Sequence, residues 1–555
     1  MSKNQSHLSA RKGLDDNLFE RMARLAAENG GAPSKEALRE LAEEFLLGEA
    51  PVYGTTTFYD FLKPENRGKE VYICDGSSCL CAGTQEALEA QLRKYVPAER
   101  IGHMTCLGRC HENAAFQYKG KNYSALSAEQ LEALFKGGEE TEVPANGRYL
   151  VESMGEDILT APDEGVESWQ TCLREILAHS PEEWIAEVKT SQLRGRGGAG
   201  FPIGLKLEFC AQAEGLQKYI VCNADEGDPA AFTDRFLLEE RPHKVLLGMI
   251  LAGYAVGSSR GILYIRGEYP EAIEAAEKAI AELEAAGCAG KDILDTDFDF
   301  HFKVIRAQGA YICGEETALL ASIEGQRPMV RTRPPFPVEE GLFLQPTVVN
   351  NVETLASLPW IALKGGDAFR QTGTEHSTGT KLLSLDSGFT KPGVYEVPMG
   401  TPLQKVVEEL AGGFSKPVKA LHIGGPLGGL VPVHKIPDLT IDFESFKEQG
   451  FLLGHASVLC VPEDMPLIAY LEHLFDFTAK ESCGKCFPCR LGSVRGRELL
   501  QKAQNEEDYR IDSTLFDDLL DTLERGSLCA LGGGMPLPVR NALQYFQEEL
   551  AGYFR

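Results

Sequence analysis

Lys218-Tyr-Ile-Val-Cys-Asn223 and Gly261-Ile-Leu-Tyr-Ile-Arg266 are two short runs of almost continuous apolar residues. Such runs are typical of strands that are buried on both faces of a sheet. Helical patterns at 243–256 and 270–285 follow the two runs in turn. Because strands and helices alternate, we expect residues 150–370 to form an α/β domain around a parallel sheet.

The segments on either side of this domain have other patterns. Apolar residues recur at helical spacing in 14–62, and a strand–helix–strand–helix pattern in 69–135 predicts a second, small α/β domain. Residues 380–440 are rich in strand patterns and glycine, and 462–555 are mainly helical in pattern. Since 555 residues exceed what one core can organise, we expect several domains, with a glycine-rich linker at 137–147.

The charge and hydropathy of the chain exclude some classes of partner. Its net charge is -27 at pH 7, which nucleic acid and anionic membrane surfaces would repel. No stretch reaches 18 uninterrupted apolar residues, and the first residues lack the apolar core of a secretory signal. We therefore expect a cytoplasmic protein that does not insert into a membrane itself and binds no nucleic acid.

A first group of cysteines, Cys74, Cys79, Cys106 and Cys110, has the spacing C-x4-C followed by C-x3-C. Its first member ends a short strand pattern. In a cytosolic chain such clusters are metal or redox ligands more often than disulfides. Four thiolates on two short loops suit a [2Fe–2S] cluster, while zinc and plain burial of the thiols are the alternatives.

A second group lies near the end of the chain. Cys483, Cys486 and Cys489 form C-x2-C-x2-C, and Cys529 follows forty residues later. Pro488 cannot donate a backbone hydrogen bond, so we expect it to keep this loop from winding into a helix. Three close thiolates and one remote thiolate predict a [4Fe–4S] cluster, with zinc as the alternative.

A glycine loop, Arg194-Gly-Arg-Gly-Gly-Ala-Gly200, lies between two helical patterns. It contains G-x-G-x-x-G, but a Rossmann fingerprint would follow a strand, and 185–192 has the pattern of a helix. We therefore interpret it as a loop whose N–H groups can approach a phosphate, rather than as a Rossmann turn. Acidic residues at 225–228 follow the next strand, where α/β proteins place ligands.

The stretch Tyr53-Gly-Thr-Thr-Thr-Phe-Tyr59, followed by the first cysteine group, resembles the thioredoxin-like [2Fe–2S] subunit of respiratory complex I. The likeness covers 14–138. The glycine loop, Asn223-Ala-Asp225, 309–317, 331–337 and 347–354 together resemble the flavin-binding subunit of complex I over 150–555.

This resemblance implies a multidomain α/β fold with five parts. They are a helical N-terminal extension (14–66), a thioredoxin-like [2Fe–2S] domain (67–138), an FMN- and NAD-binding α/β domain (150–370), a β-grasp-like domain (376–445) and a helical [4Fe–4S] domain (455–555). It assigns the first cysteine group to the [2Fe–2S] cluster and the second to the [4Fe–4S] cluster.

The resemblance also implies the residues of the flavin and nucleotide sites. Those expected around FMN are Gly195, Gly197, Lys206, Asn223, Asp225, Gly314, Asn350, Asn351 and Thr354. Those expected around NAD(H) are Phe201, Phe209, Asp228, Tyr311, Glu315, Glu316, Arg333 and Phe336. Asp228 and Arg333 stand where relatives often have Glu and Lys, which leaves NADPH open although NAD is favoured.

Flavin subunits of this kind serve several complexes. Fusion of the [2Fe–2S] part to the flavin part is found in soluble NAD-linked formate dehydrogenases and hydrogenases. We rank the β subunit of a formate dehydrogenase first, with a molybdopterin-containing α subunit as partner. The diaphorase subunit of an NAD-reducing hydrogenase ranks second and complex I third. A non-enzymatic electron-transfer or scaffold subunit is the hypothesis of another class.

Overall fold

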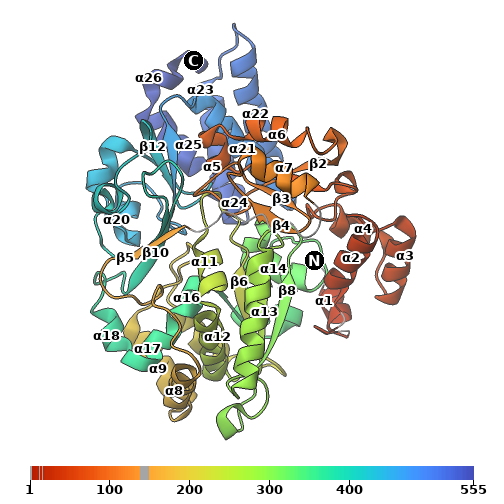
Figure 1. Cartoon of the computed structure of the whole chain (residues 1–555), viewed down its shortest axis with the longest axis vertical. Coiled ribbons are helices and arrows are strands. Elements are labelled where there is room, and N and C mark those ends of the chain that lie inside the picture. The colour runs from red at the N-terminus through yellow and green to blue at the C-terminus, as the bar shows by residue number, and fades with distance from the viewer. Residues whose placement is uncertain (1–2, 12, 16, 138–148) are drawn as a thin grey trace.

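The computed structural model describes residues 3–11, 13–15, 17–137 and 149–555, so the expected linker lies almost entirely outside the described residues. Three β-sheets organise the chain (Figure 1). Within the described part of the chain, no helix combines the length and the apolar character that crossing a bilayer requires.

The central sheet contains four parallel strands in the order β8-β7-β6-β9. Their bounds are β6 Tyr219–Ala224, β7 Arg260–Ile265, β8 His301–Arg306 and β9 Thr347–Asn351. The parallel α/β domain predicted from the two apolar runs is thus confirmed. Asn223 pairs in register with Asn351, so β6 and β9 end at the same edge of the sheet.

Both faces of this sheet are covered. Ile220 and Cys222 face a core shared with helices α12 (Pro242–Val256) and α13 (Pro270–Ala285), whereas Val221 points to the opposite face. There it packs in one core with Phe19 and other apolar residues of the N-terminal helices. The inner strands β6 and β7 are mostly apolar because their side chains enter one of the two cores, whereas the edge strand β8 carries His301, Lys303 and Arg306.

The N-terminal helices therefore belong to the packing of the central sheet as well as to the small domain that follows them. They lie at one side of the molecule (Figure 1). Their bounds are α1 Lys3–Ala10, α2 Leu18–Glu28, α3 Lys35–Glu44 and α4 Glu49–Thr56. Tyr59, just after α4, is fully buried and donates a hydrogen bond to Ser322 Oγ at 2.7 Å.

The small domain has a four-stranded sheet in the order β2-β1-β3-β4. β1 runs parallel to β2 and antiparallel to β3. The elements are β1 Val71–Cys74, α5 Ser77–Ala82, α6 Gln85–Leu92, β2 Ile101–Met104, β3 Phe116–Tyr118, β4 Lys121–Tyr123 and α7 Ala128–Lys136. This arrangement matches the strand–helix–strand–helix pattern predicted for 69–135.

A third, mixed sheet has six strands in the order β13-β12-β14-β10-β11-β5. They are β5 Leu150–Ser153, β10 Thr380–Leu385, β11 Gly393–Pro398, β12 Val418–Ile423, β13 Gly429–Pro432 and β14 Ser457–Pro462. β5 and β14 lie outside the segment 376–445, so this sheet takes strands from three of the expected segments. Its own core joins these strands through residues such as Leu383, Leu421 and Val458.

Two groups of helices lie toward opposite ends of the molecule (Figure 1). The C-terminal group is α21 Leu467–Glu481, α22 Phe487–Asn505, α23 Ser513–Gly526, α24 Ala530–Gly533, α25 Pro536–Tyr545 and α26 Gln547–Leu550. At the opposite end lie α8 Val166–Leu177, α9 Pro181–Ser191, α17 Leu358–Lys364 and α18 Gly366–Arg370. The mainly helical character predicted for the last segment is confirmed.

Candidate functional site

The glycine loop connects α9 to α10 (Ile203–Gln212), so a helix precedes it, as the sequence predicted. The loop packs against the residues that follow β9. The N–H of Arg196 donates to Thr354 Oγ1 at 2.8 Å. A Cβ on Gly197 would lie 3.0 Å from Asn351 Cβ. The structure therefore brings Gly197, Asn351 and Thr354 into one cradle at the carboxyl end of β9.

The carboxyl end of β6 completes this cradle. Asn223 Nδ2 donates to the carbonyl of Gly314 at 2.8 Å, and its Oδ1 accepts the N–H of Asp225 at 3.2 Å. Among the described residues, Asp225 Oδ2 and Asn350 Nδ2 are buried and have no hydrogen-bond partner. Buried polar atoms are normally paired, so these two atoms fit a polar ligand such as the ribityl and ring groups of FMN.

The charges of the cradle are tuned by burial. Burial raises the pKa of Asp225 well above its usual range, and Arg266 offsets only part of this effect. Burial also lowers the pKa of Lys206, whose Nζ donates to the carbonyl of Val349 at 2.9 Å and lies 3.9 Å from Glu316. One cation and hydrogen-bonding side chains thus surround the cradle, as phosphate binding requires.

Lys206 connects the cradle to part of the expected nucleotide site. Glu316 lies 3.1 Å from the guanidinium of Arg333, which also pairs with Glu315. Glu315 in turn caps α14 (Glu316–Ile323) by accepting two backbone N–H groups of its first turn. Four of the predicted residues therefore form one chain of alternating charges.

The other expected nucleotide residues are placed differently. Tyr311 donates its hydroxyl to Asp228 Oδ1 at 2.6 Å, beside the cradle. Phe201, Phe209 and Phe336 are 45%, 47% and 49% exposed, although they are large apolar rings. α10, which carries Phe209, packs against α15 (Pro337–Glu340), which begins after Phe336. Exposed rings beside a polar cradle suit stacking on a flat ligand.

The first cysteine group converges in a closed interior. All four thiols are at most 2% exposed. Cys74 Sγ is within hydrogen-bonding reach of Cys79 and Cys106, and Cys106 Sγ lies 3.6 Å from Cys110 Sγ. Four buried, mutually contacting thiols fit a metal cluster, since they otherwise have few partners. Cys106 itself has φ 55°, a left-handed conformation, in the turn that follows β2.

The flavin domain contributes directly to this first group. The N–H of Ala230 donates to Cys110 Sγ at 3.2 Å. Ala230 belongs to the loop between β6 and α11 (Thr233–Glu240), the same loop that begins with Asp225. Gly108, between two of the cysteines, faces the ring of Tyr269, because a Cβ there would lie 2.6 Å from Tyr269 Cε1. The [2Fe–2S] site and the flavin cradle thus share one connecting loop.

The second cysteine group lies nearer the surface. Cys486 immediately precedes α22, and Cys529 immediately precedes α24. The prediction that Pro488 keeps the loop from forming a helix is wrong, because Pro488 lies in the first turn of α22, where its missing N–H would have no partner. Cys489 Sγ is within reach of Cys486 and of Ser482 Oγ, at 3.3 Å from the latter. Cys483 and Cys489 are buried, whereas Cys486 and Cys529 are partly exposed.

Burial affects the thiols of this group. It raises the pKa of Cys489 to about 11 and that of Cys529 to about 12, with the neighbouring cysteines adding to the effect. A bound iron cluster requires the deprotonated thiolates, so its positive charge would reverse these shifts. The donor set fits a [4Fe–4S] cluster with one edge toward solvent.

Three sequence models of known domains match the chain. The thioredoxin-like [2Fe-2S] ferredoxin model covers residues 15–138, and the Nuo51 FMN-binding domain covers 188–360. The NADH-ubiquinone oxidoreductase-F iron-sulfur binding region covers 469–553. These assignments confirm the cofactors expected from the sequence, namely FMN, a [2Fe–2S] cluster and a [4Fe–4S] cluster.

Relatives share most of the chain. An NADH-quinone oxidoreductase subunit of Rhizobium meliloti is 41% identical over 68% of this chain and 89% of its own length. The chain belongs to the family of FMN-binding NADH-quinone oxidoreductase subunits. The NAD-reducing hydrogenase HoxS subunit alpha of Cupriavidus necator is 33% identical over 92% of this chain and 88% of its own. As a family member, the chain is an oxidoreductase subunit.

A comparison with a solved structure shows that the likeness covers nearly the whole fold of this chain. One chain of an NAD+-reducing [NiFe]-hydrogenase crystal structure in the air-oxidized state superposes with a TM-score of 0.85 and 29% identity. The match covers 98% of this chain and 95% of that chain. The multidomain fold class predicted from the sequence is therefore confirmed.

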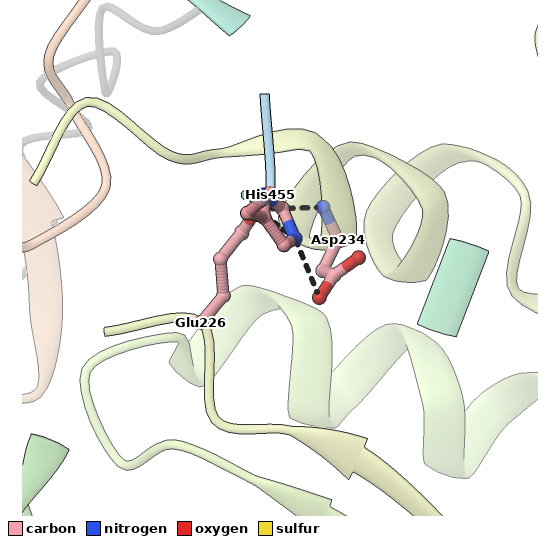
Figure 2. A group of neighbouring side chains, drawn as sticks. All are labelled: Glu226, Asp234 and His455. Atoms are coloured by element: carbon pink, nitrogen blue, oxygen red, sulfur yellow. Dashed lines mark hydrogen bonds and ion pairs between the residues drawn. The ribbon is translucent and has the colours of Figure 1, made fainter. Parts of the chain in front are cut away.

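Two buried groups around the cradle of this family member were not predicted. Beneath the glycine loop, Lys381 pairs with Glu353, and Arg196 Nε lies 4.0 Å from Glu353; all three side chains are fully buried. Beside the cradle, Glu226, Asp234 and His455 converge (Figure 2). Glu226 belongs to the acidic segment that follows β6. No local signal connects it to His455, which lies 229 positions later (455 − 226).

Proposed function

We propose that this chain is a diaphorase module, which transfers hydride between NAD(H) and FMN and passes electrons to a partner subunit. The observation that carries the proposal is the cradle with unpartnered Asp225 and Asn350 atoms, set between two groups of converging cysteines. FMN, when bound there, supplies the change from a two-electron hydride to single electrons. The chain supplies binding, orientation and electrostatics.

Most of the expected FMN residues have a distinct role in this proposal. The backbone N–H groups at Gly195 and Gly197 would bind the phosphate, and Lys206 would supply a positive charge. Asn223 and Gly314 fix the loop on which Asp225 is held. Thr354 and Asn351 hold the glycine loop against the strand end. No general base is needed, since hydride moves directly between the two rings.

The nucleotide is expected on the exposed side of the cradle. Phe201, Phe209 and Phe336 present rings on which adenine can stack. The guanidinium of Arg333 is already paired with Glu315 and Glu316. Since a 2′-phosphate would have to compete with these carboxylates, this pairing favours NAD(H) over NADP(H). NADP is the nucleotide named for one relative, the NADP-reducing hydrogenase subunit HndC of Solidesulfovibrio fructosivorans, which is 42% identical over 68% of this chain. The preference for NAD(H) is therefore tested against NADPH below.

The two cysteine groups have different parts in the proposed electron path. Cys483, Cys486, Cys489 and Cys529 would hold the [4Fe–4S] cluster through which electrons leave toward the partner. Its partly exposed edge supports this role. Cys74, Cys79, Cys106 and Cys110 would hold the [2Fe–2S] cluster as a side site, because no thiol of that group reaches the surface.

The partner that we propose is a formate-oxidising, molybdopterin-containing subunit. This proposal rests on the fused architecture together with an intact first cysteine group, which some fused hydrogenase subunits have lost. An NAD-reducing hydrogenase is the second candidate, and a specific observation favours it: the HoxS subunit alpha matches nearly the whole chain. Complex I is less favoured, because the NADH-quinone oxidoreductase relatives match 66–69% of this chain.

An anaerobic visible spectrum of the reconstituted chain tests the module. We expect NADH to bleach the flavin and iron–sulfur bands within the mixing time and NADPH to act much more slowly. A chain that binds FMN and iron but does not respond to either nucleotide would contradict the proposal. That result would favour the hypothesis of an electron-transfer or scaffold role.

A second measurement separates the partners. The proteins that co-purify with the chain from its native host are assayed for NAD+ reduction with formate and with hydrogen. Formate-dependent reduction supports the first candidate and hydrogen-dependent reduction the second. Neither activity, together with NADH-dependent quinone reduction, would favour complex I.

A further inference from the structure

Arg327 places a positive charge beside the second cysteine group. Gly484 lies between Cys483 and Cys486, and a Cβ built on Gly484 would lie 4.0 Å from Arg327 Nη2. Arg327 belongs to the segment that follows α14, and it precedes Cys483 by 156 positions (483 − 327). The arginine is partly buried, and Cys483 is 7% exposed. Tertiary packing thus brings a cation to the loop that carries three of the four thiols.

The N-terminal extension holds this guanidinium. Arg327 Nη1 donates to the carbonyl of Gly54 in α4 at 3.2 Å. Its Cζ lies 4.6 Å from the centre of the Phe58 ring. A guanidinium can make both contacts at once, because it donates hydrogen bonds in its plane and attracts an aromatic ring with its face. Residues 54–58 therefore fix where the charge of Arg327 lies.

The surroundings of Arg327 are apolar, which strengthens the effect of its charge. Phe58, Cys483 and Cys489 belong to one hydrophobic core, together with other residues of the N-terminal extension. Charges interact more strongly where apolar groups replace water. Burial lowers the pKa of Arg327, and the charge of a Cys483 thiolate offsets part of this effect. The guanidinium and the thiol are therefore close enough to interact electrostatically.

The charge of Arg327 is not cancelled by an acidic partner. Among the described residues, its contacts are a carbonyl oxygen and an aromatic ring rather than a carboxylate. Glu315, which acts on Cys529 of the same group, is itself paired with Arg333. Lys485, in the same loop, adds a further cation and donates to a backbone carbonyl at 2.6 Å. The field at the thiols is therefore more positive because of Arg327.

A second arginine contacts the same glycine from the solvent side. Arg490 Nη1 lies 3.5 Å from the carbonyl oxygen of Gly484, and its Cδ lies 3.5 Å from the Cβ built there. Its Cζ lies 5.2 Å from the centre of the Phe487 ring. Arg490 is exposed, whereas Arg327 is partly buried. The loop thus lies between two arginines that differ mainly in their contact with water.

We propose that Arg327 is a tuning residue, which raises the reduction potential of the [4Fe–4S] cluster and is positioned for this task by the N-terminal extension. The inference rests on the proposed assignment of the second cysteine group to that cluster. The potential of such a cluster depends on the net charge around it, and a nearby cation stabilises the added electron. Reduction adds one electron, which NADH supplies through the module, and Arg327 keeps its proton in both states.

This role connects the fused N-terminal part to the exit of electrons. The cysteines of the N-terminal part lie in the first group, but Gly54 and Phe58 act at the second. A higher potential at the second group favours transfer of electrons from the flavin toward the partner. The N-terminal extension therefore contributes to the direction of electron flow without carrying a ligand of the exit cluster.

The test is a potentiometric titration of the full reconstituted chain, in which the EPR signal of the [4Fe–4S] cluster is followed. Arg327→Gln removes the charge and should lower the midpoint potential by about 59 mV, which corresponds to a tenfold change in a one-electron equilibrium. The [2Fe–2S] cluster of the same molecule is the internal reference. Its potential should change by less than a third of that amount.

Three further variants separate charge from structure. Arg327→Lys keeps the charge and should retain most of the wild-type potential. Phe58→Leu removes the ring but leaves the charge, so its shift should also be small. Arg327→Met is a second neutral variant, whose thioether can still pack on the Phe58 ring. It should lower the potential as Arg327→Gln does, and it decides the question if Arg327→Gln does not assemble the cluster.

Arg490→Gln is the matched control, because it removes the same charge beside the same glycine. The titrations are made at about 0.1 M and 1 M salt, where the screening length falls from about 10 Å to about 3 Å. The small shift expected for Arg490→Gln should disappear at high salt, since Arg490 is exposed. Arg327→Gln should retain most of its shift, because salt screens a partly buried charge less.

Three results would overturn the inference. They are a wild-type potential in both neutral variants of Arg327, an equal shift in Arg327→Lys and Arg327→Gln, and a shift in Arg490→Gln as large as that in Arg327→Gln at 1 M salt. The proposed function fails differently. A reconstituted wild-type chain without a [4Fe–4S] signal removes the ligand assignment and the tuning role together, whereas a normal signal with an unshifted potential in the variants removes only the tuning role.

Discussion

The first cysteine group lies in a closed interior, whereas the second lies beside exposed apolar side chains. Cys106 is fully buried and Cys110 receives a hydrogen bond from the flavin domain. By contrast, Phe487, Leu491 and Leu528 around the second group are 68%, 56% and 46% exposed. Contiguous exposed apolar surface is typical of protein-docking sites, so these side chains support the exit of electrons that we propose at the second group.

On the proposed assignment, this difference gives the two groups different tasks. A cluster in the first group would lie deeper in the chain and farther from any partner protein, because all four of its thiols are buried. A cluster in the second group would lie close enough to the surface to exchange electrons with a partner. The cradle contacts both groups, since its loop 225–234 reaches the first group and Tyr311 reaches Glu481 at the end of α21 near the second.

The largest expected effect separates the two groups directly. Cys486→Ala should leave reduction of the flavin by NADH largely intact but abolish electron transfer to the partner. The loss should exceed the roughly 10–100-fold that removal of an outer-shell partner costs, because a direct ligand is removed. Stopped-flow flavin reduction and partner-coupled turnover measure the two steps.

The matched variant in the first group is Cys79→Ala. It should remove the [2Fe–2S] EPR signal yet retain most of the partner-coupled turnover, because that site is not on the exit path. Full coupled turnover in Cys486→Ala, or its loss only in Cys79→Ala, would reverse the assignment of the two groups.

Loss of the flavin should prevent NADH from reducing the cluster of either group. Gly197→Val places side-chain atoms where a Cβ already lies 3.0 Å from Asn351 Cβ. Overpacking of this kind costs about 1–3 kcal/mol, which corresponds to a roughly 5- to 150-fold weaker affinity for FMN. The flavin content after dialysis and the NADH reduction of both clusters are measured, and dithionite should still reduce both.

Gly552→Val is the control, because a Cβ at Gly552 meets no atom within 4 Å. Its flavin content should equal that of the wild type. A Gly197→Val chain with normal flavin content would remove the glycine loop from the cradle. NADH reduction of either cluster in a flavin-free chain would show that the two groups do not share one electron donor.

Local sequence patterns predicted the elements of this comparison, but not how they meet. The apolar runs at β6 and β7 specify a parallel sheet because each strand is buried on both faces. Cysteines that are only a few residues apart in sequence lie close together in space in any fold. The resemblance to the flavin-binding subunit, and not a local pattern, implied that Gly197, Asn351 and Thr354 lie at one site, and in the structure the glycine loop contacts both Asn351 and Thr354.

Contacts between distant segments had no such signal. Phe19 of the N-terminal extension packs on the central sheet, and Leu150 of β5 pairs with Gly393 of β11, 243 positions later (393 − 150). His455, in the loop before β14 of the third sheet, lies 3.7 Å from Glu226 because that sheet packs beside the cradle. An isolated histidine in an apolar segment does not indicate its partner, because the partner is set by tertiary packing rather than by spacing.

The docking surface proposed for the second group can be tested with one substitution. Phe487 adjoins Cys486 and is 68% exposed. Phe487→Asp should weaken binding of the partner by at least about tenfold, or roughly 1.4 kcal/mol, if this ring is buried in the complex. The [4Fe–4S] spectrum should not change, since no ligand is altered.

Leu216→Asp is the matched control for this surface. Leu216 is 100% exposed but lies in the loop between α10 and β6, away from both cysteine groups. Its partner affinity, measured by biolayer interferometry, should be that of the wild type. Equal weakening in the two variants would mean that added negative charge, and not the apolar surface at Cys486, determines binding.

The smallest expected effect concerns the dry surroundings of the first group. Asp386 is 2% exposed, accepts the hydroxyl of Ser78 at 3.3 Å, and has its pKa raised to about 7 by burial. Because its pKa in the unfolded chain is about 3.9, folding favours the protonated form, and the native state loses stability as pH rises from about 4 to about 7.

Asp386→Asn cannot ionise, so its stability relative to the wild type should be higher at pH 8 than at pH 5, by on the order of 1 kcal/mol. Thermal unfolding of the holo-chain at the two pH values measures this gain. Asp517→Asn is the control, because the Asp517 side chain is 64% exposed and contacts Arg540 at the surface. An equal change for both variants would mean that the two surroundings do not differ in polarity as their burial indicates.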